Sequence, residues 1–122
     1  MSEAQIQSVS ADQLVPGDPT PGVAREAAIV VDGLWSGRAR TEAGVTSGWH
    51  HHGEHDTIIY VVTGAIRVET AAGSDQADVG GFVYVPAHVV HRESNPTSKT
   101  AEVVVVRRGS GPITVNVDGP SA

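Results

Sequence analysis

Short runs in which apolar and polar residues alternate follow one another along most of the chain. Residues 34–41 and 65–70 alternate, and residues 58–62 and 101–107 are rich in β-branched side chains. Glycine-containing turns separate the runs, and no window keeps a helical period. The predicted strands occupy residues 27–31, 34–41, 49–52, 58–62, 65–70, 76–79, 82–85, 101–107 and 113–117, with a turn at 72–75. Many short strands joined by glycine turns are typical of a sandwich or closed barrel, so we expect an all-β fold.

The beginning of the chain differs from this pattern. Residues 16–22 contain three prolines and two glycines, which prevent regular secondary structure. We therefore expect an extended N-terminal arm at residues 1–22 and a β-barrel domain at residues 23–122. The arm either packs on the outside of the domain, packs on a partner subunit, or is a frayed terminus.

Composition narrows the classes of partner and of chemistry. A chain of 122 residues is long enough for one domain with a single core. The formal net charge of -6 argues against binding to nucleic acid or to an anionic membrane. The absence of cysteine excludes disulfides and a cysteine nucleophile. With no secretory signal and no apolar run long enough to span a bilayer, we expect a soluble, cytoplasmic protein.

All six histidines lie in two segments, residues 50–55 and 88–91, about forty residues apart. Neutral imidazole is the commonest metal ligand among side chains, and here it occurs beside carboxylates. His50 and His52 are two positions apart, so on a strand both point to one face and His51 points away. Asp56 can return toward the site after the turn at residue 53, and His91 can contribute from across a barrel. The alternative is a solvated polar loop.

Glycine, proline and asparagine stand at fixed spacings around these histidines. The first segment is framed by glycines, as Gly44, His50, His52 and Gly64. The second reads Gly80, Pro86, His91 and Asn95, with His88 at a position that is usually glycine in the pattern it resembles. These two patterns, in this order over about residues 35–107, resemble the two motifs of the cupin family. The chain is similar to a small single-domain cupin.

The resemblance implies a double-stranded β-helix, or jelly-roll barrel, that encloses one divalent transition metal ion per chain, with Fe, Mn, Zn and Ni all open. It implies His50, His52, Asp56 and His91 as the metal ligands. The commonest acidic position of the motif is Thr57 in this chain, and a hydroxyl is a poor ligand for a divalent ion. Asp56 matches a shorter spacing that some small cupins use. The alternative is a three-histidine site completed by water, with Thr57 nearby.

Residues that line the pocket or its rim are suggested by strand alternation. They are Arg38 or Arg40, Tyr60, Arg67, Phe82 and Tyr84. For Phe82 and Tyr84 the simpler interpretation is packing. An arginine on the interior face would indicate an anionic substrate held by two hydrogen bonds. Candidates for moving a proton are Tyr60, Tyr84 and His88.

Three hypotheses of function follow from these residues. The first is a metal-dependent enzyme of dioxygenase, isomerase or lyase type that acts on a small polar or anionic metabolite. The second is a non-catalytic module that binds a metal or a small molecule. The third is a structural metal site that stabilises a dimer. Fold does not choose among them. We also expect a homodimer, because an open sheet edge needs covering and the arm could cross to a neighbour.

Overall fold

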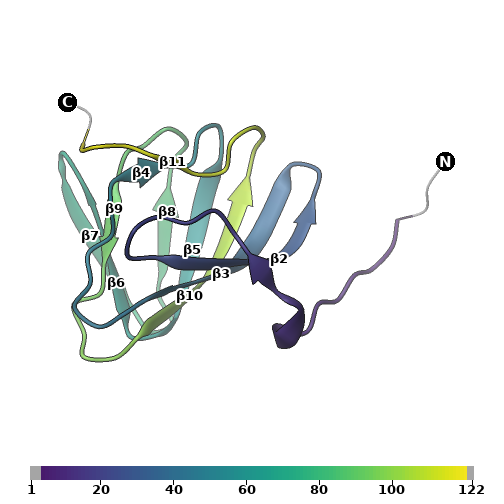
Figure 1. Cartoon of the computed structure of the whole chain (residues 1–122), viewed down its shortest axis with the longest axis horizontal. Helices are drawn as coiled ribbons and strands as arrows, with labels where there is room; N and C mark the ends of the chain where they lie inside the picture. Colours follow the sequence, from purple (N-terminus) through teal and green to yellow (C-terminus); the bar gives the residue numbers. More distant parts are fainter. Residues whose placement is uncertain (1–3, 121–122) are drawn as a thin grey trace.

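The computed structural model describes residues 4–120, whose strands form three antiparallel sheets (Figure 1). The elements are η1 (Ala11–Gln13), a single 3-10 turn, and the strands β1 (Val15–Pro16), β2 (Ala24–Val31), β3 (Leu34–Thr41), β4 (His50–His51), β5 (Asp56–Thr63), β6 (Ala65–Thr70), β7 (Gly73–Asp78), β8 (Phe82–Val85), β9 (Arg92–Ser94), β10 (Ala101–Arg108) and β11 (Val115–Asn116). The sheet orders are β1-β2-β3-β10-β5-β8, β7-β6-β9 and β11-β4. No helix in the described residues is long and apolar enough to cross a membrane. The predicted all-β fold is confirmed.

The hydrophobic core lies between the six-stranded and the three-stranded sheet. It joins side chains of the larger sheet, Ile59, Val61, Val103 and Val105, to side chains of the smaller one, Ile66, Val68 and Ala77. The three central strands of the larger sheet, β3, β5 and β10, bury every second residue. In β5, for example, Thr57, Ile59 and Val61 are buried. This alternation decides which neighbouring side chains reach the interior.

Two elements differ from the sequence prediction. Residues 72–75 were expected to be a turn, but β7 begins at Gly73 and pairs with β6 from Thr70↔Gly73 onward. This edge strand is almost wholly exposed, so both its faces are polar and no alternation marks it. The three-residue strand β9 was not predicted, because its pairing with β6 rather than a local pattern defines it.

The start of the chain is partly attached to the domain. β1 pairs with the edge of β2, and Thr20 forms an isolated bridge to Val23, where both side chains are buried. Residues 4–10 run away from the body of the molecule (Figure 1). The division into an arm at residues 1–22 and a barrel at residues 23–122 stays a prediction.

Candidate metal centre

Backbone hydrogen bonds join the two histidine segments. The His50 N–H donates to the His91 carbonyl at 2.9 Å, and the His91 N–H donates to the His50 carbonyl at 2.9 Å. β11 pairs with the other side of β4 and fixes this short strand. As strand alternation predicts, His50 and His52 share one face, and both are buried beside His91. The ring centres of His50 and His91 are 4.4 Å apart.

The three imidazoles share one hydrogen-bonding arrangement. In each, Nδ1 lies beside a backbone carbonyl: His50 beside Gly48 at 3.0 Å, His52 beside Ile113 at 2.8 Å and His91 beside Val89 at 2.9 Å. A carbonyl oxygen only accepts, so each Nδ1 carries the proton that it donates. In a neutral ring the opposite nitrogen, Nε2, then has a free lone pair. Metal-binding histidines in proteins are oriented in this way.

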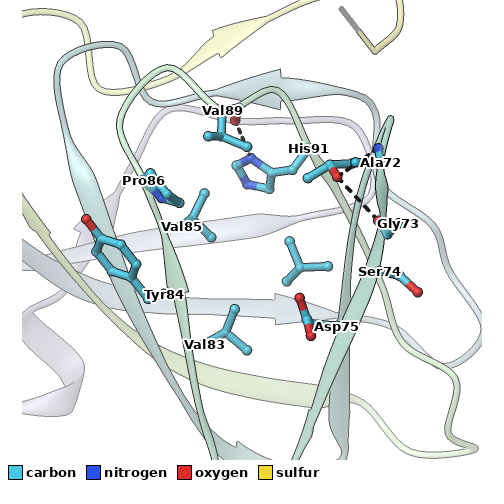
Figure 2. Close-up of a pocket in the computed structure, with 12 residues that line it drawn as sticks. Ala72, Gly73, Ser74, Asp75, Val83, Tyr84, Val85, Pro86, Val89 and His91 are labelled. Carbon is cyan, nitrogen blue, oxygen red and sulfur yellow. Dashed lines mark hydrogen bonds between the residues drawn. The ribbon is translucent and has the colours of Figure 1, made fainter. Parts of the chain in front are cut away.

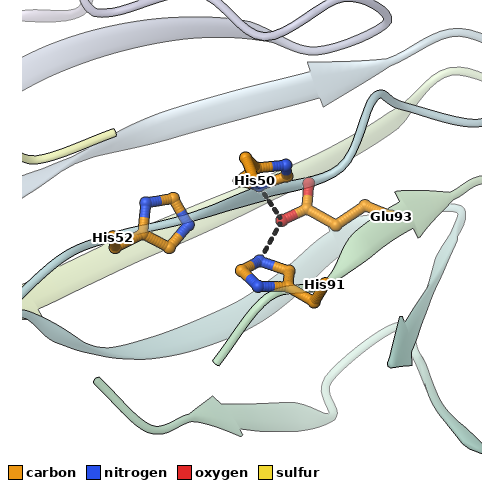
Figure 3. Close-up of side chains that lie close together, drawn as sticks. All are labelled: His50, His52, His91 and Glu93. Carbon is orange, nitrogen blue, oxygen red and sulfur yellow. Dashed lines mark ion pairs between the residues drawn. The ribbon is translucent and has the colours of Figure 1, made fainter. Parts of the chain in front are cut away.

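Glu93 completes the cluster. One ligand atom from each of the four residues His50, His52, His91 and Glu93 lies within 4.8 Å of the others, and all four residues are buried (Figure 3). Glu93 Oε1 is 3.7 Å from His50 Nε2 and 3.6 Å from His91 Nε2. His91 Nε2 has no hydrogen-bond partner. A buried imidazole nitrogen without a donor, beside a carboxylate oxygen and two further imidazoles, suits a cation, so these four residues can hold one metal ion.

Burial and neighbouring side chains together keep His52 and Glu93 in the protonation states that metal binding needs. Burial lowers the pKa of His52 to about 2, and the charges of Arg107, His91 and His50 act in the same direction. Burial by itself would raise the pKa of Glu93, but His50 and His91 hold it well below its usual range. At neutral pH, His52 is therefore a neutral imidazole and Glu93 a carboxylate.

Two buried arginines flank the imidazoles. Arg25 from β2 places a guanidinium nitrogen 3.1 Å from His50 Nε2, and Arg107 from β10 places one 3.4 Å from His52 Nε2. Arg25 also donates to the Thr20 hydroxyl at 2.7 Å, whereas Arg107 Nε has no partner. Burial lowers the pKa of Arg107 to about 9, and the Arg25 charge adds to this effect. Both guanidinium groups stay protonated at neutral pH.

Asp56, predicted as the fourth ligand, lies away from the histidines. Its carboxylate accepts hydrogen bonds from Arg108 at 2.8 Å and from the Tyr84 hydroxyl at 3.1 Å on the outer face of the sheet. The reason is strand alternation. β5 begins at Asp56 and turns Thr57 inward, so Asp56 must point outward. Thr57 itself is buried, and its hydroxyl has no hydrogen-bond partner.

Glu93 takes the place in the cluster that was predicted for Asp56. A signal was present in the sequence, because His91 and Glu93 are two positions apart, as are His50 and His52. On an extended segment both members of each pair point to the same side. The cupin motif places the acidic ligand after His52, and for this reason the sequence prediction did not include Glu93.

The other predicted site residues lie outside the cluster. Tyr60 stacks against Phe82 on the outer face of the sheet, with ring centres 4.9 Å apart. Tyr84 is exposed there and hydrogen-bonds to Asp56. The three predicted pocket arginines have other partners. Arg38 and Arg40 form partly buried ion pairs with Glu26 and Glu102, and Arg67 donates an exposed hydrogen bond to Gln76.

His88 occupies a left-handed turn. Its φ is +66°, whereas every other positive φ in the described residues belongs to a glycine. Its ring is exposed, and Nε2 lies 3.1 Å from Glu54. The glycine of the resembled motif suits this conformation, because a Cβ clashes with the backbone in the left-handed region.

Replacing His88 with glycine should therefore stabilise the protein. We expect the His88→Gly variant to gain about 1 kcal/mol in the free energy of unfolding, measured by urea denaturation. Its affinity for a divalent metal should stay that of the wild type, because His88 lies outside the cluster. A loss of stability would show that the exposed contact with Glu54 outweighs the backbone strain.

A cavity reaches the cluster from the side of β6, β7 and β8. Its volume is about 420 Å³, and His91 is one of its lining residues (Figure 2). The lining is mixed: Val68, Val83, Val85, Pro86 and Val89 are apolar, and Thr70, Ser74, Asp75 and His91 are polar. A space of this size beside a buried imidazole suits a small molecule.

The fold is shared with known cupins. KdgF from Halomonas sp. is 21% identical, with 87% of this chain and 96% of that chain covered and a TM-score of 0.69. An RmlC-like cupin from Shewanella frigidimarina is 20% identical, with 87% and 93% covered and a TM-score of 0.70. Oxalate oxidase in complex with glycolate is 20% identical over 78% of this chain and 55% of that chain, with a TM-score of 0.67. No curated protein matches the sequence. These likenesses establish the jelly-roll fold.

The family follows from the sequence match itself. The model of the cupin domain family matches residues 37–107, which include His50, His52, His91 and Glu93. The predicted resemblance is confirmed over most of the β domain. The chain belongs to the cupin family.

Proposed function

We propose that this protein is a metal-dependent enzyme of dioxygenase, isomerase or lyase type that acts on a small anionic metabolite. One observation carries the proposal: His50, His52 and His91 turn their Nε2 atoms toward Glu93 in a buried space. Three imidazoles and one carboxylate are a ligand set for Fe, Mn, Zn or Ni that leaves positions open for a substrate. When bound, the metal would polarise a carbonyl or enolate, or activate dioxygen.

The charges around the cluster support an anionic substrate. Among the described residues, the buried side chains with a full charge are Arg25, Arg107 and Glu93, which together carry one positive charge. A divalent ion would add two more in a space of low dielectric. Buried charge without a counter-charge is strongly unfavourable, and a carboxylate on the substrate would provide one. Arg25 and Arg107 would orient that carboxylate.

Turnover by the metal-loaded protein tests this proposal. The chain would first be freed of metal with a chelator and reloaded with Fe(II), Mn(II) or Zn(II) under anaerobic conditions. The loaded protein would then be mixed with a series of small carboxylates in the presence of dioxygen. A dioxygenase should consume dioxygen, measured with an oxygen electrode. An isomerase or lyase should exchange the proton next to the substrate carbonyl with D₂O, measured by ¹H NMR. We expect activity only with metal present and at least tenfold less with Arg107→Gln.

The position of the acid–base candidates favours a second function, the binding of a metal and a small anion without turnover. Tyr60, Tyr84 and His88 all lie away from the four clustered residues, and within the described residues no further carboxylate joins the cluster. A module that binds a metal and a small anion without turnover would need no such group. Binding of a carboxylate to the loaded protein by calorimetry, with neither dioxygen uptake nor proton exchange, would establish this function instead.

We also propose that the protein is a homodimer. Both edges of the six-stranded sheet are formed by short strands, β1 and β8, and open edges are commonly covered by association. The cytoplasmic location expected from the sequence stays a prediction.

A further inference from the structure

The outer face of the six-stranded sheet carries a block of exposed apolar side chains. The pairing of β10, β5 and β8 places them in two neighbouring rows, Val106, Ile58 and Tyr84 in one and Val104, Tyr60 and Phe82 in the other. Each of the six is between 37% and 69% exposed. We call these six residues the apolar face. Two neighbouring rows of apolar side chains are unusual on an outer face. The strands of an antiparallel sheet with one face in water normally alternate, with apolar residues on the core face and polar residues on the water face.

The size of this surface approaches that of a protein–protein interface. With the adjoining Leu34 and Val62, which are also exposed, the apolar face presents roughly 600 Å². The largest apolar patch of a typical monomer is about 300–600 Å² and is often functional, and a standard interface buries about 800 Å² per partner, so the apolar face lies at the upper end of the monomer range. A hollow of about 370 Å³ lies on the same face beside Ile58, Tyr84 and Val106. Phe82, at 69% exposure, projects from the next row.

The charges around the apolar face fit a second copy of the same surface. At one end, Arg108 forms an ion pair with Asp56 at 2.8 Å. Beside the face, Arg38 and Arg40 contact Glu26 and Glu102. Each group holds equal numbers of positive and negative side chains, so two identical faces meet without net repulsion. A membrane is a poorer fit, because the border is not basic and the chain carries a net charge of -6.

We infer that the apolar face is the interface of the homodimer, with the six-stranded sheets of two copies packed face to face. This inference rests on the proposed homodimer and names its surface. It differs from pairing through strand edges or through the N-terminal arm. Burying two sets of aromatic and branched side chains against each other supplies the association energy. The metal cluster lies on the inner side of the sheet and is not part of this contact.

Sedimentation velocity of the full chain at micromolar concentrations tests the inference. The wild type should have twice the chain mass of 12.6 kDa. Phe82→Glu and Val104→Glu each place a charge in the contact and should raise the dimer dissociation constant at least 100-fold, giving the monomer mass. Val30→Glu is the matched control. Val30 is similarly exposed, at 57%, but it pairs with the inward-facing Trp35 and so lies on the other side of the sheet. This variant should remain a dimer.

The outcomes separate the homodimer from its surface. A monomeric wild type rejects both the homodimer and the interface. A wild-type dimer that persists in Phe82→Glu and Val104→Glu rejects the apolar face and leaves the homodimer standing, held by edges or arm. If the wild type is monomeric without lipid and floats with neutral lipid vesicles, the apolar face binds a membrane instead. Circular dichroism of each variant should match the wild type, because all three substituted side chains are partly exposed.

Discussion

Replacing Glu93 with alanine should weaken divalent metal binding by at least about 100-fold, and His50→Ala or His91→Ala should abolish it. Glu93 brings the carboxylate oxygen within 3.7 Å of both imidazole nitrogens. Without the Glu93 carboxylate, a bound divalent ion would lie beside two buried arginines, and no negatively charged side chain would balance these positive charges. Calorimetric titration of the metal-free protein with Zn²⁺ measures the effect. Glu93→Gln keeps the shape of the side chain and separates lost charge from lost packing.

Asp56→Ala is the matched control for this experiment. Asp56 is also a carboxylate on a strand, but it binds Arg108 and Tyr84 on the outer face, so its loss should leave metal affinity unchanged. Thr57→Ala should likewise have a small effect, because a neutral hydroxyl is a poor ligand for a divalent ion. If Asp56→Ala loosened the metal more than Glu93→Ala, the cluster seen in the fold would not be the binding site.

Gly37→Ala should cost about 3 kcal/mol of stability and lower the melting temperature by roughly 10 °C. A Cβ at position 37 would clash with the Glu26 carbonyl oxygen and would lie 2.7 Å from the Trp35 ring. The oxygen belongs to the paired strand β2, so relief requires β2 and β3 to separate. β2 also carries Arg25, and the change should therefore disturb the neighbourhood of His50. Differential scanning calorimetry measures the shift.

Gly48→Ala provides the comparison at another glycine. Its added Cβ would meet the Pro21 ring at 3.6 Å, an ordinary van der Waals contact, and its backbone has no positive φ. We expect a change in melting temperature of no more than about 2 °C. Equal effects of the two substitutions would show that backbone freedom, rather than close approach of the two strands, decides the cost at position 37.

Local periodicity explains what could be predicted of the site. The pairing of His50 with His52 needed only the two-residue period of a strand, and the fixed spacing to Pro86 identified His91. The same period places Thr57 inward with Ile59 and Val61. Asp56, one position before Thr57, therefore points outward. The spacing of the family motif points to Asp56, whose carboxylate lies on the outer face with Arg108 and Tyr84.

Sequence by itself determined the all-β class and the shared face of His50 and His52, because each depends on residues that are close together in the chain. Tertiary structure decided the rest. Glu93, Arg25 and Arg107 come from three different strands, and only the pairing of those strands brings them to one place. The apolar face arises in the same way, since residues about forty positions apart become neighbours through the register of β10 against β5. Side-chain alternation is local, whereas the register between strands is set by the packing of the whole barrel.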